Sequence, residues 1–477
     1  MTSSDILDDI FNSEHFRKSG HALVEMLADH LQNITVRNSG LPVTKFIDPE
    51  SEYHFWKALD EKNPEVLLKT ILERSINIHH PRFMGHQVSA PAPLAALAAF
   101  EGAFLNNGGA VFEMGQASCA LERYIIDEFK PFFGFGMDAD GFFTSGGTIA
   151  NLTALLSARS SADSQDIWKE GNDKQYAFMV SEEAHYCIDR AVRIMGWGSK
   201  GIISIPVDDD FRMRTDLLQE KYIHALSEGV HVLGVVGSAP STATGMYDNL
   251  EAIGRFCADN NLWFHIDAAH GGPAVFSEKY RNLMEGSRFA DSITVDAHKM
   301  MMVPGLTTML FFKNYKTSYQ TFAQRAHYLW NSDDAEWYNY GKRTMECTKL
   351  MMSIRVYLML KTYGKEAFGA FIDHCYDLGK HFYKLLSQHK SIETVVQPDS
   401  NIVCFRYKNN SVTDHDHVNS RIRERILNEG NFYIVQTKIK GQLFLRTTLI
   451  SPLTENIDLQ ALISTVVGYG DEIAFKE

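Results

Sequence analysis

Two apolar segments of the chain end in residues that can do chemistry together. Lys299 follows the apolar run 292–295, and Asp267 follows the apolar run 262–266, 32 residues earlier (299 − 267). Both runs are predicted to be buried strands. An amine and a carboxylate at neighbouring strand ends are what pyridoxal 5'-phosphate (PLP) requires, because the amine condenses with the cofactor aldehyde and the acid keeps the ring nitrogen protonated. The protonated ring then accepts electrons from an amino-acid α-carbon.

The sequence around this pair resembles a known family. His265-Ile-Asp-Ala-Ala269 and Asp296-Ala-His-Lys299 are similar to the signatures of the group II PLP-dependent amino-acid decarboxylases, which include the glutamate, cysteine-sulfinate, aromatic-L-amino-acid and 2,4-diaminobutyrate enzymes. The resemblance covers nearly the whole chain and is strongest over residues 80–350. It implies PLP as the cofactor and the decarboxylation of an L-amino acid to an amine. For the residue pattern alone, two ordinary buried strands with a solvated lysine are the alternative.

Helix and strand patterns alternate along the middle of the chain. Besides the two runs above, strands are predicted at 141–144, 177–180 and 230–236, and helices at 149–159 and 250–260. Such alternation predicts an α/β domain with a mostly parallel, buried sheet whose ligands lie at the carboxyl ends of the strands. The resemblance implies PLP fold type I (aspartate-aminotransferase-like), with a seven-stranded sheet in the large domain and a small C-terminal α+β domain.

Three segments are expected: an N-terminal helical dimerisation segment over 1–75, a large PLP-binding domain over 76–344, and a small C-terminal domain over 345–477. Apolar residues at three- and four-residue steps predict the N-terminal helices. Their role in a homodimer with shared active sites is implied by the resemblance, and packing on their own subunit is the alternative. In the last segment the patterns predict helices at 345–362 and 365–388, strands at 402–407, 432–437 and 443–448, and a final helix from Asn456.

A glycine-rich turn enters the predicted helix 149–159. Backbone amides at a helix N-terminus bind phosphate well, although a Gly-Gly pair alone is often only a tight turn. The resemblance assigns Gly146, Gly147 and Thr148 to the cofactor phosphate, and His298 as a further phosphate contact. Asp296 departs from the family, which normally has Asn there. A carboxylate repels phosphate, so either a phosphate contact or a bond to a backbone donor is left open for Asp296.

The resemblance also implies contacts to the cofactor ring and a proton donor. His185 matches a histidine that stacks on the ring, Ala269 a small residue on the opposite face, and Thr242 a contact to the phenolic oxygen region. Tyr328, 29 residues past Lys299 (328 − 299), matches a tyrosine on a mobile loop that protonates the substrate carbon after carbon dioxide is lost. A structural histidine and a surface aromatic are the alternatives for His185 and Tyr328.

Three residues are candidates for substrate binding. Arg446 resembles an arginine that engages a substrate carboxylate, with a structural ion pair as the alternative. His86 and Gln87 lie in a stretch that resembles a lining of the substrate side-chain pocket. His270 replaces a common aromatic, and Glu346-Cys-Thr-Lys349 departs from the usual Gly-Arg pattern. The substrate therefore cannot be named from the sequence.

Composition narrows the partners and the compartment. The 477 residues carry a formal net charge of −13, which argues against nucleic acid and anionic membrane surfaces as partners. Six scattered cysteines without a Cys-x-x-Cys pair predict reduced thiols in a cytoplasmic protein. His79, His80 and His86 lack the spacing of a zinc site, so no metal is expected.

The prediction is thus a PLP-dependent amino-acid decarboxylase, a carboxy-lyase whose partner is a small amino-acid substrate. Lys299, Asp267, His185 and Tyr328 are the predicted catalytic residues. Another PLP reaction, such as that of an aldehyde synthase, transaminase or lyase, and a catalytically inactive homologue are the alternatives.

Overall fold

The computed structural model describes residues 3–36, 40–162, 167–322 and 336–476. The chain divides into two compact units. The first comprises Met1–His86, Leu385–Glu393 and Phe405–Glu477, and the second comprises Gln87–Lys384 and Thr394–Cys404. The three segments predicted from the sequence follow different boundaries, and they stay a prediction about folding units.

A seven-stranded sheet forms the centre of the second unit, with the order β1-β7-β6-β5-β4-β2-β3. The strands β2, β3, β4, β5 and β6 run parallel, whereas β7 is antiparallel to both of its neighbours. The sheet is therefore mostly parallel, as predicted. The strands are β1 (Asp140–Thr144), β2 (Tyr176–Ser181), β3 (Ile202–Ile205), β4 (His231–Ser238), β5 (Trp263–Asp267), β6 (Ser292–Asp296) and β7 (Thr308–Phe312).

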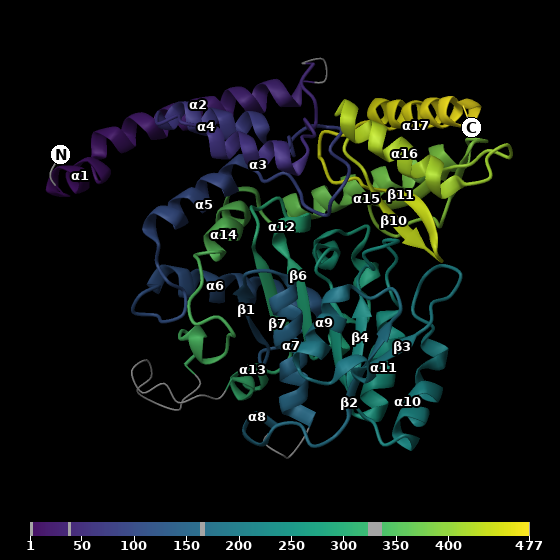
Figure 1. Ribbon diagram of the computed structural model, residues 1–477. Coiled ribbons are helices and arrows are strands. Elements are labelled where there is room, and N and C mark those ends of the chain that lie inside the picture. The colour runs from purple at the N-terminus through teal and green to yellow at the C-terminus, as the bar shows by residue number, and fades with distance from the viewer. Residues whose placement is uncertain (1–2, 37–39, 163–166, 323–335, 477) are drawn as a thin grey trace. The chain divides into compact units, whose positions relative to one another are not determined.

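Helices cover both faces of this sheet (Figure 1). On one face, Asn151 of α7 (Gly147–Ala162) reaches His265 and Asp267 of β5. On the other face, a Cβ atom added to Gly237 would meet Phe264 and two side chains of α11 (Leu250–Asn260). Burial on both faces explains why the strands read as continuous apolar runs.

The remaining helices of the second unit surround these layers, and α15 belongs to it for most of its length. They are α5 (Pro93–Leu105), α6 (Gln116–Phe129), α8 (Ile167–Glu170), α9 (Tyr186–Ile194), α10 (Leu218–Ser227), α12 (Ala297–Met300), α13 (Tyr315–Thr321), α14 (Ser353–Tyr363) and α15 (Glu366–Ser387).

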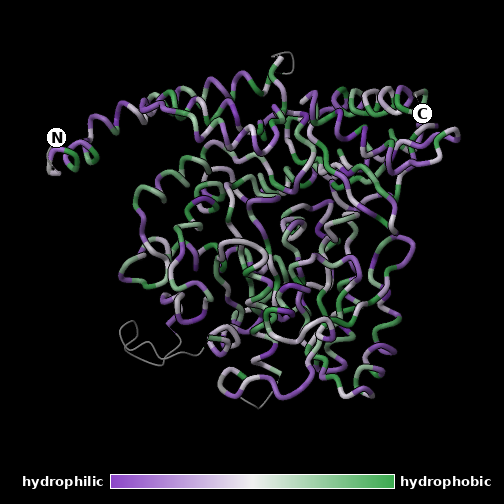
Figure 2. Tube along the Cα trace, viewed as in Figure 1, coloured by the Kyte–Doolittle hydropathy of each residue, from purple (hydrophilic) through white to green (hydrophobic). Residues whose placement is uncertain are grey.

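The N-terminal part of the first unit is helical, as predicted. It contains α1 (Ser3–Ile10), α2 (Ser13–Thr35), α3 (Pro49–Ala58) and α4 (Pro64–Arg74). Asn12 caps α2 by accepting hydrogen bonds from Glu14 N and His15 N, as short polar side chains do at helix starts. Polar and apolar positions both occur along these helices (Figure 2).

The C-terminal part of the chain is α+β. A four-stranded sheet has the order β10-β11-β9-β8, in which β10 and β11 are antiparallel. Its elements are β8 (Ile392–Thr394), β9 (Ile402–Tyr407), α16 (His415–Glu429), β10 (Val435–Ile439), β11 (Gln442–Thr448) and α17 (Asn456–Lys476). Within the described part of the chain, every helix falls short of the length or the apolar character that crossing a membrane demands.

Two boundaries predicted from the sequence were wrong. The helix predicted at 345–362 begins only at Ser353, because Lys349, before it, is tied to β1 by a hydrogen bond from its Nζ to Phe143 O. The strand predicted at 432–437 begins at Val435, because the Tyr433 backbone instead bonds Met84 and Arg82.

Candidate active site

A cavity of about 270 Å³ lies in the second unit, where several parallel strands end. Its lining includes ten of the predicted site residues, which lie on β5, α7 and α12 and in the segments beside β1, β4, β5, α5 and α9. These residues are Gln87, Gly146, Gly147, Thr148, His185, Thr242, Asp267, Ala269, His298 and Lys299. The structure therefore brings together the residues that the sequence assigned to the cofactor.

Lys299 lies on the single turn of α12, directly after β6. Its side chain is 20% exposed, and its ammonium Nζ is 2.9 Å from Oδ2 of Asp296. Burial by itself would lower the pKa of Lys299, but the charges of Asp296 and then Asp267 raise it above the ordinary value. Lys299 is thus held as an ammonium ion at the wall of the cavity.

Asp296 is buried at the end of β6 and is held by side chains. Besides the Lys299 ammonium, it accepts a hydrogen bond of 2.5 Å from the Thr308 hydroxyl, and His298 Nε2 lies 3.8 Å from its carboxylate. Burial would raise the pKa of Asp296, but Lys299 and His298 together lower it. The sequence left open whether Asp296 contacts the cofactor phosphate or a backbone donor. The partners that the structure shows for this carboxylate are side chains, those of Lys299, Thr308 and His298.

Asp267 ends β5, with both carboxylate oxygens hydrogen-bonded. Oδ1 accepts from Ala269 N at 3.2 Å, and Oδ2 accepts from Asn151 Nδ2 at 3.0 Å. The parallel register places Ser238 of β4 and Thr294 of β6 opposite Asp267. Two donors, a backbone amide and a side-chain amide, thus fix the orientation of this carboxylate.

The glycine turn between β1 and α7 has backbone features that favour glycine. Gly146 has φ +130°, a conformation that residues with side chains rarely adopt. A Cβ atom on Gly147 would lie 3.0 Å from an oxygen of Asp296. Ser145 N, just before this pair, donates to Glu346 Oε2 at 3.3 Å, so the turn already holds one carboxylate oxygen. The first amides of a helix lack partners within the helix and suit an anionic group.

His185 is the N-cap of α9, and its Nδ1 accepts a hydrogen bond from Cys187 N at 3.3 Å. Burial lowers the pKa of His185 despite the opposing charge of Asp267. Among the described residues, His185, Cys187 and Asp267 present ligand atoms within 4.8 Å of one another. Burial raises the pKa of Cys187 to about 12, which disfavours the thiolate that a metal would require.

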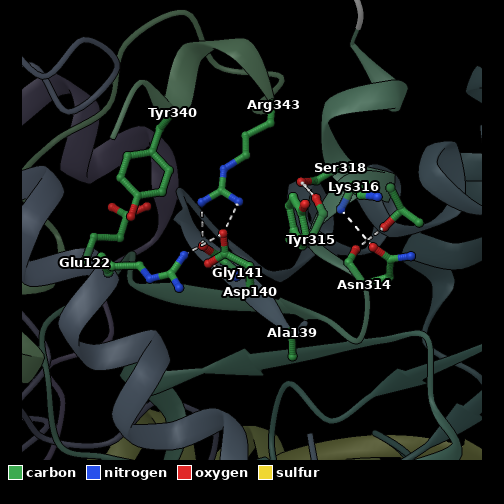
Figure 3. A network of polar contacts seen from close by, with 12 residues as sticks. Glu122, Ala139, Asp140, Gly141, Asn314, Tyr315, Lys316, Ser318, Tyr340 and Arg343 are labelled. Carbon is green, nitrogen blue, oxygen red and sulfur yellow. Dashed lines mark hydrogen bonds and ion pairs between the residues drawn. The ribbon is translucent and has the colours of Figure 1, made fainter. Parts of the chain in front are cut away.

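Buried ion pairs position β1, the edge strand that leads into the glycine turn. Arg343 donates to Asp140 at 2.6 Å and to Gly141 O at 3.1 Å (Figure 3). Lys349, paired with Glu122, donates to Phe143 O at 2.9 Å, while Phe143 N donates to Glu122 at 2.9 Å.

Through these ion pairs, charged side chains form hydrogen bonds with backbone atoms on the free edge of β1. An unpaired edge would otherwise expose a row of donors and acceptors. The turn that follows β1 is therefore anchored by charged side chains from distant parts of the sequence.

Two of the predicted residues that the structure describes are not part of this cavity lining. Arg446 and His86 belong to the first unit, where burial, followed by the charges of Arg446 and Arg423, lowers the pKa of His86. Tyr328 lies outside the described residues.

The sequence reasoning missed Asn151, Ser238 and Cys187, which also line the cavity. A signal was present for two of them. Asn151 lies four residues after Gly147, one helical turn along α7 and on the same face. Ser238 ends β4, two residues beyond the end predicted for this strand. A strand of that length would have placed Ser238 beside Asp267 in the parallel sheet.

Comparison with known proteins agrees with this geometry. Residues 56–408 match the family model of the pyridoxal-dependent decarboxylase conserved domain. The chain belongs to this family, and it is a PLP-dependent amino-acid decarboxylase.

Individual relatives share modest identity over long alignments. An aromatic-L-amino-acid decarboxylase of Bacillus atrophaeus is 25% identical, covering 98% of this chain and 97% of that protein. An L-aspartate decarboxylase of Metarhizium robertsii is 29% identical over 72% of this chain and 69% of its own. The crystal structure of mouse CSAD shares the fold, with TM-score 0.89, 22% identity, and coverage of 96% and 99%.

Proposed function

We propose that the protein converts an L-amino acid to the corresponding amine and carbon dioxide at this cavity. The observation that carries the proposal is the convergence of Lys299, Asp267 and His185 on one cavity beside a glycine turn. Decarboxylases of the matched family act on aromatic, acidic and diamino substrates by their names. These relatives act on different substrates, so we propose the reaction type and leave the side chain of the amino-acid substrate unassigned.

The residues around the cavity fit PLP. Gly146, Gly147 and Thr148 would hold its phosphate at the start of α7, Lys299 would bind its aldehyde carbon, and Asp267 would pair with its ring nitrogen. When bound, the cofactor supplies a ring that delocalises the electron pair left on the α-carbon by departing carbon dioxide.

Five protein side chains have further tasks in this proposal. Asp267 holds a proton on the ring nitrogen by its negative charge, and Ala269 leaves room for the ring. His185 would cover the ring and limit water. Thr242 and His298 would contact the cofactor's phenolic oxygen and phosphate, respectively.

Arg446, His86 and Gln87 are proposed to bind the substrate, as the family resemblance implies. Tyr328 is proposed to return the proton to the substrate carbon.

A product assay tests the proposed reaction. The purified protein with PLP should be incubated with each of the twenty common amino acids, 2,4-diaminobutyrate and cysteine sulfinate, and carbon dioxide, amine, keto acid and aldehyde should be measured. Equal amounts of carbon dioxide and amine from at least one substrate are expected, and Lys299→Ala should form neither. Keto acid or aldehyde as the main product would indicate another PLP reaction, and no product with any substrate would favour the inactive homologue.

The protein is also proposed to act as a homodimer in the cytoplasm. Ile10 and Phe11, at the end of α1, are 65% and 83% exposed, an apolar surface that a second copy would cover in the proposed dimer. All six cysteines are free thiols, which supports a reducing compartment. Sedimentation should give a dimer, and Ile10→Asp with Phe11→Asp should shift it toward the monomer; an unchanged dimer would argue for another interface.

A further inference from the structure

Five side chains form one continuous hydrogen-bonded series that ends at the carboxylate of Asp267. All five are buried, with exposed fractions between 0% and 9%. In order they are Trp263, Ser292, His265, Asn151 and Asp267. All belong to the second unit.

The strand geometry explains how these side chains meet. Trp263, His265 and Asp267 alternate along β5, so their side chains point to the same face of the sheet. Ser292 of β6 is the register partner of His265. Asn151 approaches this face from α7, between His265 and Asp267.

The direction of each bond follows from what each group is able to donate. Asn151 Nδ2 donates to Asp267 Oδ2 at 3.0 Å, because an ionised carboxylate only accepts. The amide oxygen of Asn151 is therefore the atom that faces His265 Nε2, at 3.0 Å. An oxygen there requires a donor, so His265 carries its proton on Nε2.

The rest of the series follows from that proton. His265 Nδ1 is then an acceptor, and the Ser292 hydroxyl donates to it at 2.8 Å. Ser292 in turn accepts from Trp263 Nε1 at 3.0 Å, since an indole nitrogen only donates. Burial lowers the pKa of His265 to about 4, which agrees with a neutral ring at neutral pH. Every bond in the series thus donates toward Asp267.

We propose that Asn151 and His265 are positioning residues that hold Asp267 ionised and aimed at the cofactor ring nitrogen. This inference rests on the proposed function, in which Asp267 pairs with that nitrogen. Aligned donors in a buried series polarise one another and strengthen the last bond, which here ends on the charge. A merely structural series would stabilise the fold without changing the protonation of the ring nitrogen.

The first experiment measures that protonation in the PLP-bound protein by nitrogen-15 NMR of ring-labelled cofactor across pH. Asn151→Leu removes the donor to Asp267 at similar volume, and should lower the pH at which the ring nitrogen loses its proton by about one unit, a tenfold change in the equilibrium. Ser157→Ala is the matched control, because Ser157 is also buried on α7 but bonds Thr153 O. An Asn151→Leu midpoint equal to that of the control would overturn the proposal.

The second experiment uses a conservative rescue at the other positioning residue. His265→Gln keeps a side-chain donor toward Asn151, and should hold the ring-nitrogen midpoint close to that of the natural protein. His265→Leu removes this donor and should lower the midpoint in the same direction as Asn151→Leu. Equal midpoints for the two His265 variants would contradict the role of the donor.

A third measurement is made on the natural sequence, so its result does not depend on whether the variants above fold well. Nitrogen-15 spectra of histidine-labelled protein, with the His265 signals identified by their loss in His265→Gln, should show the Nε2–H tautomer of His265 and a neutral ring down to about pH 5. The Nδ1–H tautomer, or titration near the ordinary value of about 6.5, would overturn the direction of the series. Failure of the proposed function is separately visible, because borohydride would then leave no pyridoxyl label on Lys299.

Discussion

The Asp296 carboxylate lies 2.9 Å from the ammonium of Lys299, three residues along the same turn. The amine that is proposed to bind the cofactor is therefore paired before the cofactor arrives. An ammonium ion is not a nucleophile, so Lys299 must lose a proton before it attacks an aldehyde. Asp296 opposes that loss, because it stabilises the charged form.

Asp296→Asn should make cofactor capture faster at neutral pH. Loss of the negative charge lowers the pKa of Lys299, so more of the amine is neutral at a given pH. The pH profile of the capture rate, followed by absorbance after mixing with PLP, should move down by about one unit, or roughly tenfold in rate below the midpoint. Asp189→Asn, which removes an exposed ion pair to Arg193, is the control. An unmoved profile in Asp296→Asn would show that the pair does not set the reactivity of Lys299.

The same pair should make the stability of the cofactor-free protein depend on pH at both extremes. The pKa of Asp296 is lowered, so its contribution is present above the ordinary value of 3.8 and is lost as the pH falls through the lower folded value. The pKa of Lys299 is raised, so its contribution is present below 10.5 and is lost as the pH rises through the higher folded value. Melting temperatures across pH should show both losses, and Asp296→Asn should flatten the acidic one.

Asp267→Asn separates binding of the cofactor from its activation. Lys299 and the glycine turn are unchanged in this variant, so borohydride should still fix the pyridoxyl group on Lys299. Turnover should fall by roughly 100-fold or more, the size of loss seen when one hydrogen-bond donor to the transition state is removed from an enzyme site, because a neutral amide does not keep the ring nitrogen protonated. Normal turnover in Asp267→Asn would exclude the proposed pairing.

Lys349→Met should damage the cofactor site from a distance. It leaves Glu122 as an uncompensated buried charge, which costs about 3–5 kcal/mol of stability, and frees Phe143 O next to the glycine turn. Both the melting temperature and the affinity for PLP should fall. The double variant Glu122→Gln with Lys349→Met should recover much of the melting temperature, since no buried charge is left alone. A double variant no more stable than the single one would contradict the ion-pair explanation.

Tyr328→Phe tests the residue that lies outside the described structure. Only a hydroxyl is removed, so affinity for PLP and substrate should change little. Without a proton donor for the decarboxylated carbon, amine formation should slow and the ratio of aldehyde to amine should rise, which product analysis with oxygen-uptake measurement can detect. Amine formation at the natural rate with no aldehyde would place the proton donor elsewhere.

The strands of the site were predictable because each is a local pattern. The runs before Asp267 and Lys299 are apolar and end in polar residues, and a parallel sheet brings such ends to one edge. Helix α7 was predictable from its glycine turn, but the bond from Asn151 to Asp267 depends on how the helix packs on β5. The helix predicted from 345 failed for the same reason, because Lys349 is drawn to β1 by a contact that no local pattern contains. Pairing of Asp296 with Lys299 is local, yet the sequence suggested only phosphate or a backbone donor for Asp296, because the direction of the Lys299 side chain depends on how α12 packs.

The buried ion pairs that position β1 also have a consequence for how the chain folds during its synthesis. Glu122 and Lys349 are 227 residues apart in the sequence, so the strand and its glycine turn leave the ribosome long before the lysine that secures them. Contacts of such long range form late in folding, because a large loop must first be closed. A nascent chain that already contains Gly147, Asp267 and Lys299 would still have a loose edge strand. Firm capture of the cofactor is therefore expected only after the segment around Lys349 has been translated and has docked.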